Sequence, residues 1–106
     1  EGASSIAAMI VEPVVGANGV LIPPPGYLAK LKVLLERYGI LMICDEVMTG
    51  FGRCGSFWGF ERDGFIPDLV TMGKGMTCGY APGGAIAFHQ RLSAFFETNV
   101  FVGGLT

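Results

Sequence analysis

Two unbroken apolar runs constrain the fold of this chain more than any other feature of its sequence. Ile6–Val11 is closed by Glu12, and Ile40–Cys44 is closed by Asp45. An apolar run of this length that does not alternate with polar residues predicts a strand covered on both faces, as in a parallel sheet. We therefore expect an α/β fold in which a mostly parallel sheet is flanked by helices.

The segment between the two runs predicts a loop followed by a helix. Gly16, Gly19 and the prolines at 23–25 are typical of a loop. Apolar residues then recur at helical spacing at Leu28, Leu31, Leu34, Leu35 and Tyr38, and the charged residues Lys30, Lys32, Glu36 and Arg37 fall on the rest of the helix surface. A right-handed strand–helix–strand unit places Glu12 and Asp45 at one edge of the sheet, where ligands bind in α/β folds.

Two further strands are expected downstream, over 68–72 and 85–88, followed by a short helix over 91–97. Lys74 follows the first of these strands, between Gly73 and Gly75. In the short helix we expect Leu92, Phe95 and Phe96 to point inward. Residues 1–106 contain no repeat and no interdomain linker, so we treat them as one unit.

Charge and composition exclude some partners. Lys and Arg number 7 and Asp and Glu 9, a formal net charge of −2 that does not suit nucleic acid. Only 15% of residues are charged, against about 25% in ordinary domains, so much of the surface is expected to be covered by protein outside this sequence. The apolar runs are shorter than the roughly 18 residues of a membrane span, and we expect a cytoplasmic protein without membrane contact.

Cysteine and histidine content argues against a metal site. Cys44, Cys54 and Cys78 are odd in number and lack paired spacing, and His89 is the single histidine. We expect buried or incidental thiols.

The stretch Gly50–Gly55 matches the G-x-G-x-x-G pattern of dinucleotide-binding proteins. It keeps open an alternative, a nicotinamide-dependent oxidoreductase using Gly50, Gly52 and Gly55. The context argues against it, because that motif opens a helix and residues 56–60 have no helical period.

Asp45 and Lys74 each follow a predicted buried strand. A lysine amine can form a Schiff base with an aldehyde cofactor, and a carboxylate facing the pyridine nitrogen of pyridoxal phosphate (PLP) keeps that nitrogen protonated. For an isolated pair, a loop-capping aspartate and a solvated lysine are the commoner explanation.

The surrounding motifs favour the cofactor hypothesis. They are Val11-Glu12-Pro13, Gly19–Pro24 with Gly26-Tyr27-Leu28, Asp45-Glu46-Val47, Thr49–Arg53, and Pro67-Asp68 leading to Lys74. In this order and spacing the chain resembles the class III PLP-dependent aminotransferases over its whole length, especially the ω-amino acid:pyruvate branch. The resemblance implies that residues 1–106 form the central part of the PLP-binding large domain of fold type I, an internal fragment that is inactive alone.

The resemblance also implies roles for individual residues. Lys74 becomes the Schiff-base lysine and the catalytic acid/base, and Asp45 the partner of the pyridine nitrogen. Val47 would press on the ring face, although ordinary core packing explains it equally well. Thr106 matches a threonine that binds the cofactor phosphate of the other subunit, which implies a homodimer with shared active sites.

The implied activity is PLP-dependent transamination by a ping-pong mechanism, from an amine or ω-amino acid to a keto acid such as pyruvate. An aminomutase or decarboxylase on the same scaffold is an alternative. Ala17 stands where ornithine and γ-aminobutyrate enzymes carry a glutamate, which makes those substrates less favoured. Met48 replaces a glutamine that family members often place beside the cofactor's phenolic oxygen.

Overall fold

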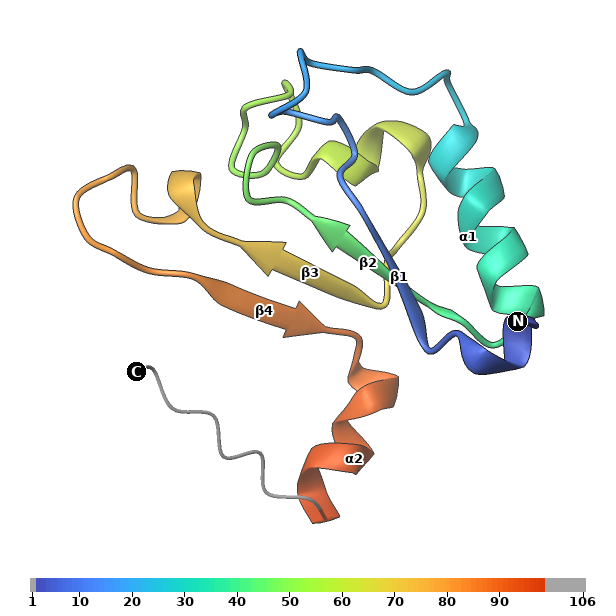
Figure 1. Ribbon diagram of the computed structural model, residues 1–106. Coiled ribbons are helices and arrows are strands. Elements are labelled where there is room, and N and C mark those ends of the chain that lie inside the picture. Colours follow the sequence, from blue (N-terminus) through green and yellow to red (C-terminus); the bar gives the residue numbers. More distant parts are fainter. Residues whose placement is uncertain (1, 99–106) are drawn as a thin grey trace.

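The computed structural model describes residues 2–98 and forms a four-stranded sheet with the strand order β1-β2-β3-β4 (Figure 1). Its helices and strands are β1 (Ala8–Val11), α1 (Tyr27–Arg37), β2 (Leu41–Asp45), β3 (Leu69–Met72), β4 (Ala85–Phe88) and α2 (Ser93–Thr98). Strands β1, β2 and β3 are parallel, and β4 is antiparallel to β3. The predicted α/β class with a mostly parallel sheet is confirmed.

The β1–α1–β2 unit has the expected arrangement. Val11 pairs with Cys44 in the parallel register, so the two strands end side by side. The loops that follow β1, β2 and β3 gather at the same edge of the sheet (Figure 1). Gly39, with φ +68°, takes the left-handed conformation that lets the chain turn from α1 into β2.

The core lies between α1 and one face of the sheet. It consists of Leu28, Leu35, Ile40, Met42, Cys44 and Phe60, the last from the single-turn helix η2 (Gly59–Asp63). Along β2 the buried residues Met42 and Cys44 alternate with half-buried ones. This period of two shows that the described residues cover one face of the sheet more completely than the other.

The prediction that the first strand is covered on both faces is wrong for the described residues. The side chains of Met9 and Ile10 in β1 are exposed, with 58% of Ile10 accessible. Helix α1 packs on the face of the sheet that carries Met42. Helix α2 follows the carboxyl end of β4 (Figure 1). An unbroken apolar run predicts that both faces of a strand are covered, but it does not identify the segments that cover them.

Two helical faces also differ from expectation. In α1, Lys32 is buried and Leu34 is exposed, and so is Tyr38, directly after the helix. In α2, Phe95 and Phe96 are exposed although we expected them to point inward. The Phe96 ring does contact that of Phe88, at 4.7 Å between ring centres, so α2 packs on the end of β4 rather than into the core.

Candidate active site at the strand ends

The predicted pair of site residues lies at the ends of neighbouring parallel strands. Asp45 is the last residue of β2, and Lys74 comes two residues after β3 ends. Asp45 pairs with Thr71 in the β2–β3 register, and the Glu46 N–H donates to the Thr71 carbonyl at 2.9 Å. The parallel topology therefore brings the two segments together as the sequence predicted.

Asp45 is half-buried and is oriented by its own loop. Its Oδ1 accepts a hydrogen bond from the Val47 N–H at 3.0 Å, which is an Asx turn. This bond fixes the direction of the carboxylate at the strand end. The other carboxylate oxygen, Oδ2, has no donor among residues 2–98.

Val47 lies against the backbone that leads to Lys74. A Cβ placed on Gly73 would lie 3.5 Å from Val47 Cγ1 and 3.6 Å from Val47 Cγ2. Val47 is half-buried, so part of its surface remains available at the strand ends. The structure thus brings Asp45, Val47 and the Lys74 segment into one place.

Lys74 is exposed and has an unusual backbone conformation. Its φ of +34° lies in the left-handed region, which a lysine adopts only at a cost of about 1–3 kcal/mol. It begins the single-turn helix η3 (Lys74–Met76), and its Nζ contacts Met48 Sδ. Strain of this kind is concentrated at functional sites, where the surrounding structure imposes it.

Met48 connects the loop after β1 with the lysine. Its Cε and Cγ would lie 3.0 Å from a Cβ on Gly16. A larger residue at Gly16 would therefore force Met48, whose Sδ contacts Lys74 Nζ, to move. The loops after β1, β2 and β3 meet at this methionine.

Thr106, the remaining predicted cofactor-binding residue, lies outside the described residues. Its predicted contact with a cofactor phosphate stays a prediction.

Glu46 is the residue that sequence reasoning undervalued. It is completely buried, and its carboxylate accepts hydrogen bonds from the Thr49 hydroxyl and from the N–H groups of Gly59 and Phe60. It holds the glycine- and aromatic-rich loop against the end of β2. The available signal was a second acidic residue directly after a buried strand, since such a charge requires several donors.

Asp68 forms a second buried anchor, at the opposite end of β3. Its carboxylate accepts two hydrogen bonds from Lys32 Nζ, at 2.9 and 2.8 Å, one from the Met42 N–H at 2.8 Å, and one from Arg91. Burial alone would raise the pKa of the Asp68 carboxyl, but the hydrogen bonds from Lys32, Met42 and Arg91 outweigh it and lower that pKa. The buried position of Lys32 follows from this pairing.

The cysteines match the expectation of buried or incidental thiols. Cys44 is buried, and burial, reinforced by the nearby Glu46 carboxylate, raises the pKa of its thiol to about 12. Such a thiol is unreactive at neutral pH. Cys54 and Cys78 are exposed and unpaired, and residues 2–98 contain no cluster of metal-ligating side chains.

The local backbone explains why glycine occurs in the Gly50–Gly55 stretch. A Cβ on Gly50 would lie 2.9 Å from the Glu46 carbonyl oxygen, and Gly52 has a φ of +89°. The stretch continues into further turns and the short η2 rather than a regular α-helix. It lacks the helix N-terminus that a dinucleotide-binding motif needs.

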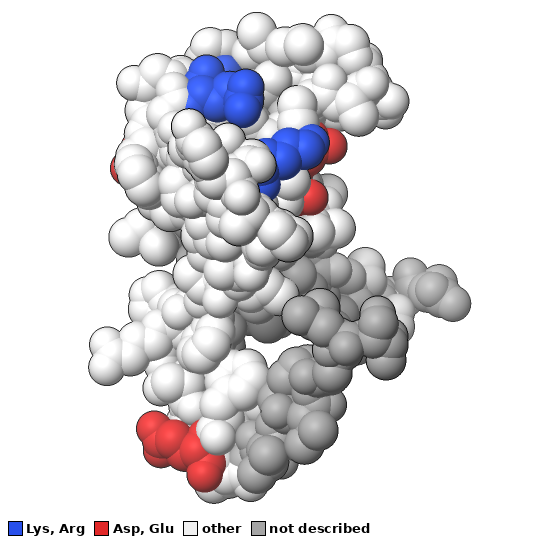
Figure 2. Space-filling view, turned by 90° about the vertical axis from the view of Figure 1, so that its left-hand side faces the viewer, with Lys and Arg blue, Asp and Glu red and all other residues white. Residues whose placement is uncertain are grey.

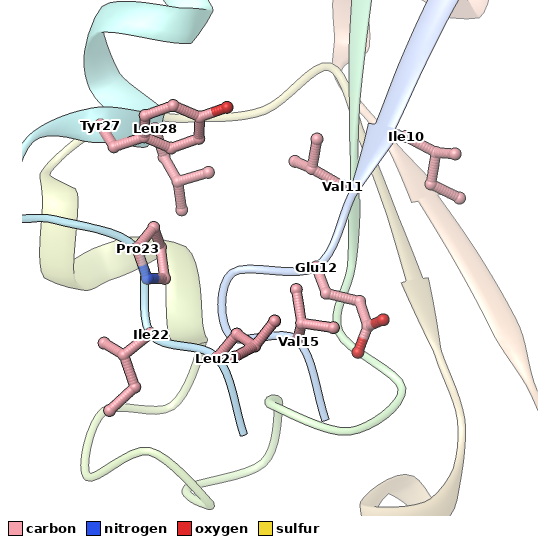
Figure 3. Close-up of a pocket in the computed structure, with 9 residues that line it drawn as sticks. All are labelled: Ile10, Val11, Glu12, Val15, Leu21, Ile22, Pro23, Tyr27 and Leu28. Atoms are coloured by element: carbon pink, nitrogen blue, oxygen red, sulfur yellow. The ribbon is translucent and has the colours of Figure 1, made fainter. Parts of the chain in front are cut away.

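A separate cavity of about 380 Å³ lies between β1 and the start of α1 (Figure 3). Glu12 is the charged residue among those lining it, and its carboxylate points away from Pro23 (Figure 3). Glu12 Oε2 accepts the Gly16 N–H at 2.9 Å, so this residue anchors the loop that follows β1. None of Asp45, Val47 and Lys74 lines this cavity.

The view toward the strand ends is mostly uncharged, with one basic group beside acidic side chains, a second basic group above it, and a separate acidic group at the bottom (Figure 2). Arg53, within the Gly50–Gly55 stretch, is exposed. None of the helices within residues 2–98 has the length and apolar character needed to span a membrane.

Comparisons with known proteins identify the family of this chain. The family model described as "Aminotransferase class-III" matches residues 1–103. An omega-aminotransferase of Caulobacter vibrioides is 55% identical over 85 residues, which is 80% of this chain and 19% of that protein. Gamma aminobutyrate transaminase 2 of Solanum lycopersicum is 40% identical over 100% of this chain and 24% of that protein.

Solved structures give the same result. An (S)-enantioselective omega-transaminase from Thermomicrobium roseum is 45% identical, with a TM-score of 0.93 over 99% of this chain and 24% of that chain. Taurine:2-oxoglutarate aminotransferase from Bifidobacterium kashiwanohense, in complex with PLP and glutamate, is 48% identical with a TM-score of 0.94, and the shares covered are 99% and 24%. This chain thus spans between 19% and 24% of the length of these relatives. It belongs to the class-III aminotransferase family.

Proposed function

We propose that the protein containing this chain transfers an amino group from an amine or ω-amino acid to a keto acid such as pyruvate, with PLP as cofactor. The observation that carries the proposal is the placement of Asp45 and Lys74 at the ends of adjacent parallel strands, with Val47 against the backbone between them. Residues 1–106 would form the central part of the PLP-binding large domain.

The residues present fit PLP chemically. An aldehyde requires an amine, and Lys74 is exposed, with no carboxylate partner among the described residues. A ring nitrogen that carries a proton requires a carboxylate, and Asp45 Oδ2 remains without a donor in residues 2–98. When bound, PLP supplies an electron sink for the charge left on the substrate carbon after proton removal.

Each residue then has a distinct task. Lys74 Nζ would hold the cofactor as a Schiff base. Once displaced by the amino substrate, it would take the proton from the substrate's amino-bearing carbon and deliver it to the C4′ carbon of the cofactor. Asp45 would keep a proton on the ring nitrogen, an electrostatic role. Val47 would pack on the ring face and exclude water there.

The substrate class rests on the names of the relatives. They include omega-aminotransferases, γ-aminobutyrate transaminases and a taurine aminotransferase, and the last two act on amines remote from their acid group. Ala17 argues against γ-aminobutyrate, yet several relatives of 40–46% identity carry that name, so this substrate stays among the candidates. No observation favours an aminomutase, a decarboxylase or a nicotinamide enzyme.

We further propose a cytoplasmic homodimer with shared active sites. Large apolar side chains are exposed on the sheet and its loops, among them Ile22 (65%) and Ile86 (63%), and such surface is typical of contacts with other protein. The resemblance of Thr106 to a residue that serves the neighbouring subunit supports the shared site. Three unpaired cysteines suit the reducing cytoplasm.

Replacing the proposed catalytic lysine tests the function. In the full-length protein, Lys74→Ala should abolish transfer of an amino group to pyruvate, because the acid/base at the substrate carbon is lost. Lys30→Ala, which removes an exposed lysine from α1, is the matched control and should leave the rate unchanged. Turnover that persists in Lys74→Ala at the rate of the Lys30→Ala control would refute the assignment.

A further inference from the structure

The hydroxyl of Thr71 is the buried polar group that the account so far leaves unexplained. Thr71 Oγ1 is inaccessible to solvent and has no hydrogen-bond partner among the described residues. Buried hydroxyls in native proteins are almost always hydrogen-bonded, because an unmade bond leaves the desolvation cost uncompensated. An isolated orphan of this kind at a site calls for a partner.

The sheet register identifies the neighbours of this hydroxyl. Thr71 pairs with Asp45 on one side and with Ile86 on the other. Paired residues on adjacent strands point to the same face, and the strands lie about 4.8 Å apart. Along β3 the residues on that face are Leu69 and Gly73. Within this group Asp45 alone has a side chain that accepts a hydrogen bond.

The backbone holds Thr71 and Asp45 together. The Glu46 N–H donates to the Thr71 carbonyl, so the end of β2 cannot slide along β3 without losing that bond. The Asp45 carboxylate has one donor in the described residues, the Val47 N–H on Oδ1. Each carboxylate oxygen can accept two hydrogen bonds, so capacity remains for the threonine hydroxyl and for a ring nitrogen.

We propose that Thr71 is a positioning residue for Asp45. With PLP bound, its hydroxyl donates to the Asp45 carboxylate and keeps that group directed at the ring nitrogen. The inference rests on the proposed function, since it assigns Thr71 a role within that cofactor site. Thr71 touches neither cofactor nor substrate in this account and acts through Asp45.

The test compares Thr71→Val and Thr71→Ser in the full-length protein. We expect Thr71→Val to weaken PLP binding to the cofactor-free protein by about tenfold, the effect of one hydrogen bond to a charged group. It should also lower kcat and leave KM for the amino donor unchanged. Thr71→Ser, which keeps the hydroxyl, should restore both quantities.

Urea unfolding of the cofactor-free protein supplies a readout that a purely structural role would move. Because Thr71 Oγ1 has no partner before PLP binds, Thr71→Val should leave the unfolding midpoint unchanged or raise it. Wild-type PLP affinity in Thr71→Val would overturn the inference, and so would a lowered midpoint in the cofactor-free protein. Failure of the unaltered protein to bind PLP would instead refute the proposed function.

Discussion

Asp45 and Lys74 illustrate how much of a site single residues can reveal. Each was predicted to follow a buried strand, and that position alone predicted their shared edge, which the parallel β2–β3 register confirms. The Lys74 φ of +34° and the Met48 contact were beyond prediction, because they depend on where three loops meet. Glu46 was missed for the same reason, since its donors come from residues 49, 59 and 60.

Replacing Asp45 tests the electrostatic role at this scale. Asp45→Asn in the full-length protein should still bind PLP through Lys74 but should lower kcat by about 100-fold or more, because a neutral amide cannot keep the ring nitrogen protonated. Glu97→Gln removes a carboxylate from the exposed surface of α2 and should change nothing. A kcat of Asp45→Asn equal to that of the control would contradict the role, as measured by steady-state kinetics with saturating amino donor.

Helix α1 shows why an element's faces are harder to predict than its existence. The periodicity predicted the helix well, and it spans Tyr27–Arg37. Lys32 lies on the same helix face as Leu28 and Leu35, at intervals of four and three residues. Because Lys32 is charged, we expected it to be exposed. Asp68, distant in sequence, provides the partner that makes burial of this lysine possible.

This anchor should give the protein a defined acid sensitivity. The folded state lowers the pKa of the Asp68 carboxyl below its ordinary 3.8, so its stabilising effect is complete above that value and is lost as the pH falls through the lowered pKa. Asp68→Asn should therefore lower the urea midpoint at pH 7 and flatten its decline below pH 3.8.

Glu36→Gln is the control for this experiment. Glu36 pairs with the same Lys32 at 3.2 Å, but 57% of its side chain is exposed, and exposed pairs contribute little. Its urea midpoint should follow that of the unaltered protein at every pH. An acid dependence of Asp68→Asn identical to that of Glu36→Gln would show that the buried anchor has no stabilising effect.

At the scale of the whole molecule, composition predicted more burial of apolar side chains than the described residues provide. With 51% hydrophobic residues, the chain leaves large apolar side chains such as Ile10, Ile66 and Ile86 exposed. The family relatives are four to five times as long by the shares they have in common. The missing cover was therefore predictable as a need, but its source could not be predicted from these residues.

The central claim is that Lys74 holds the cofactor. The most direct measurement is borohydride reduction of the full-length protein with PLP, followed by peptide mapping by mass spectrometry, since reduction makes the bond between lysine and cofactor permanent. The account predicts one pyridoxyl group, on Lys74, and none on Lys30. A label on another lysine, or no label at all, would contradict it.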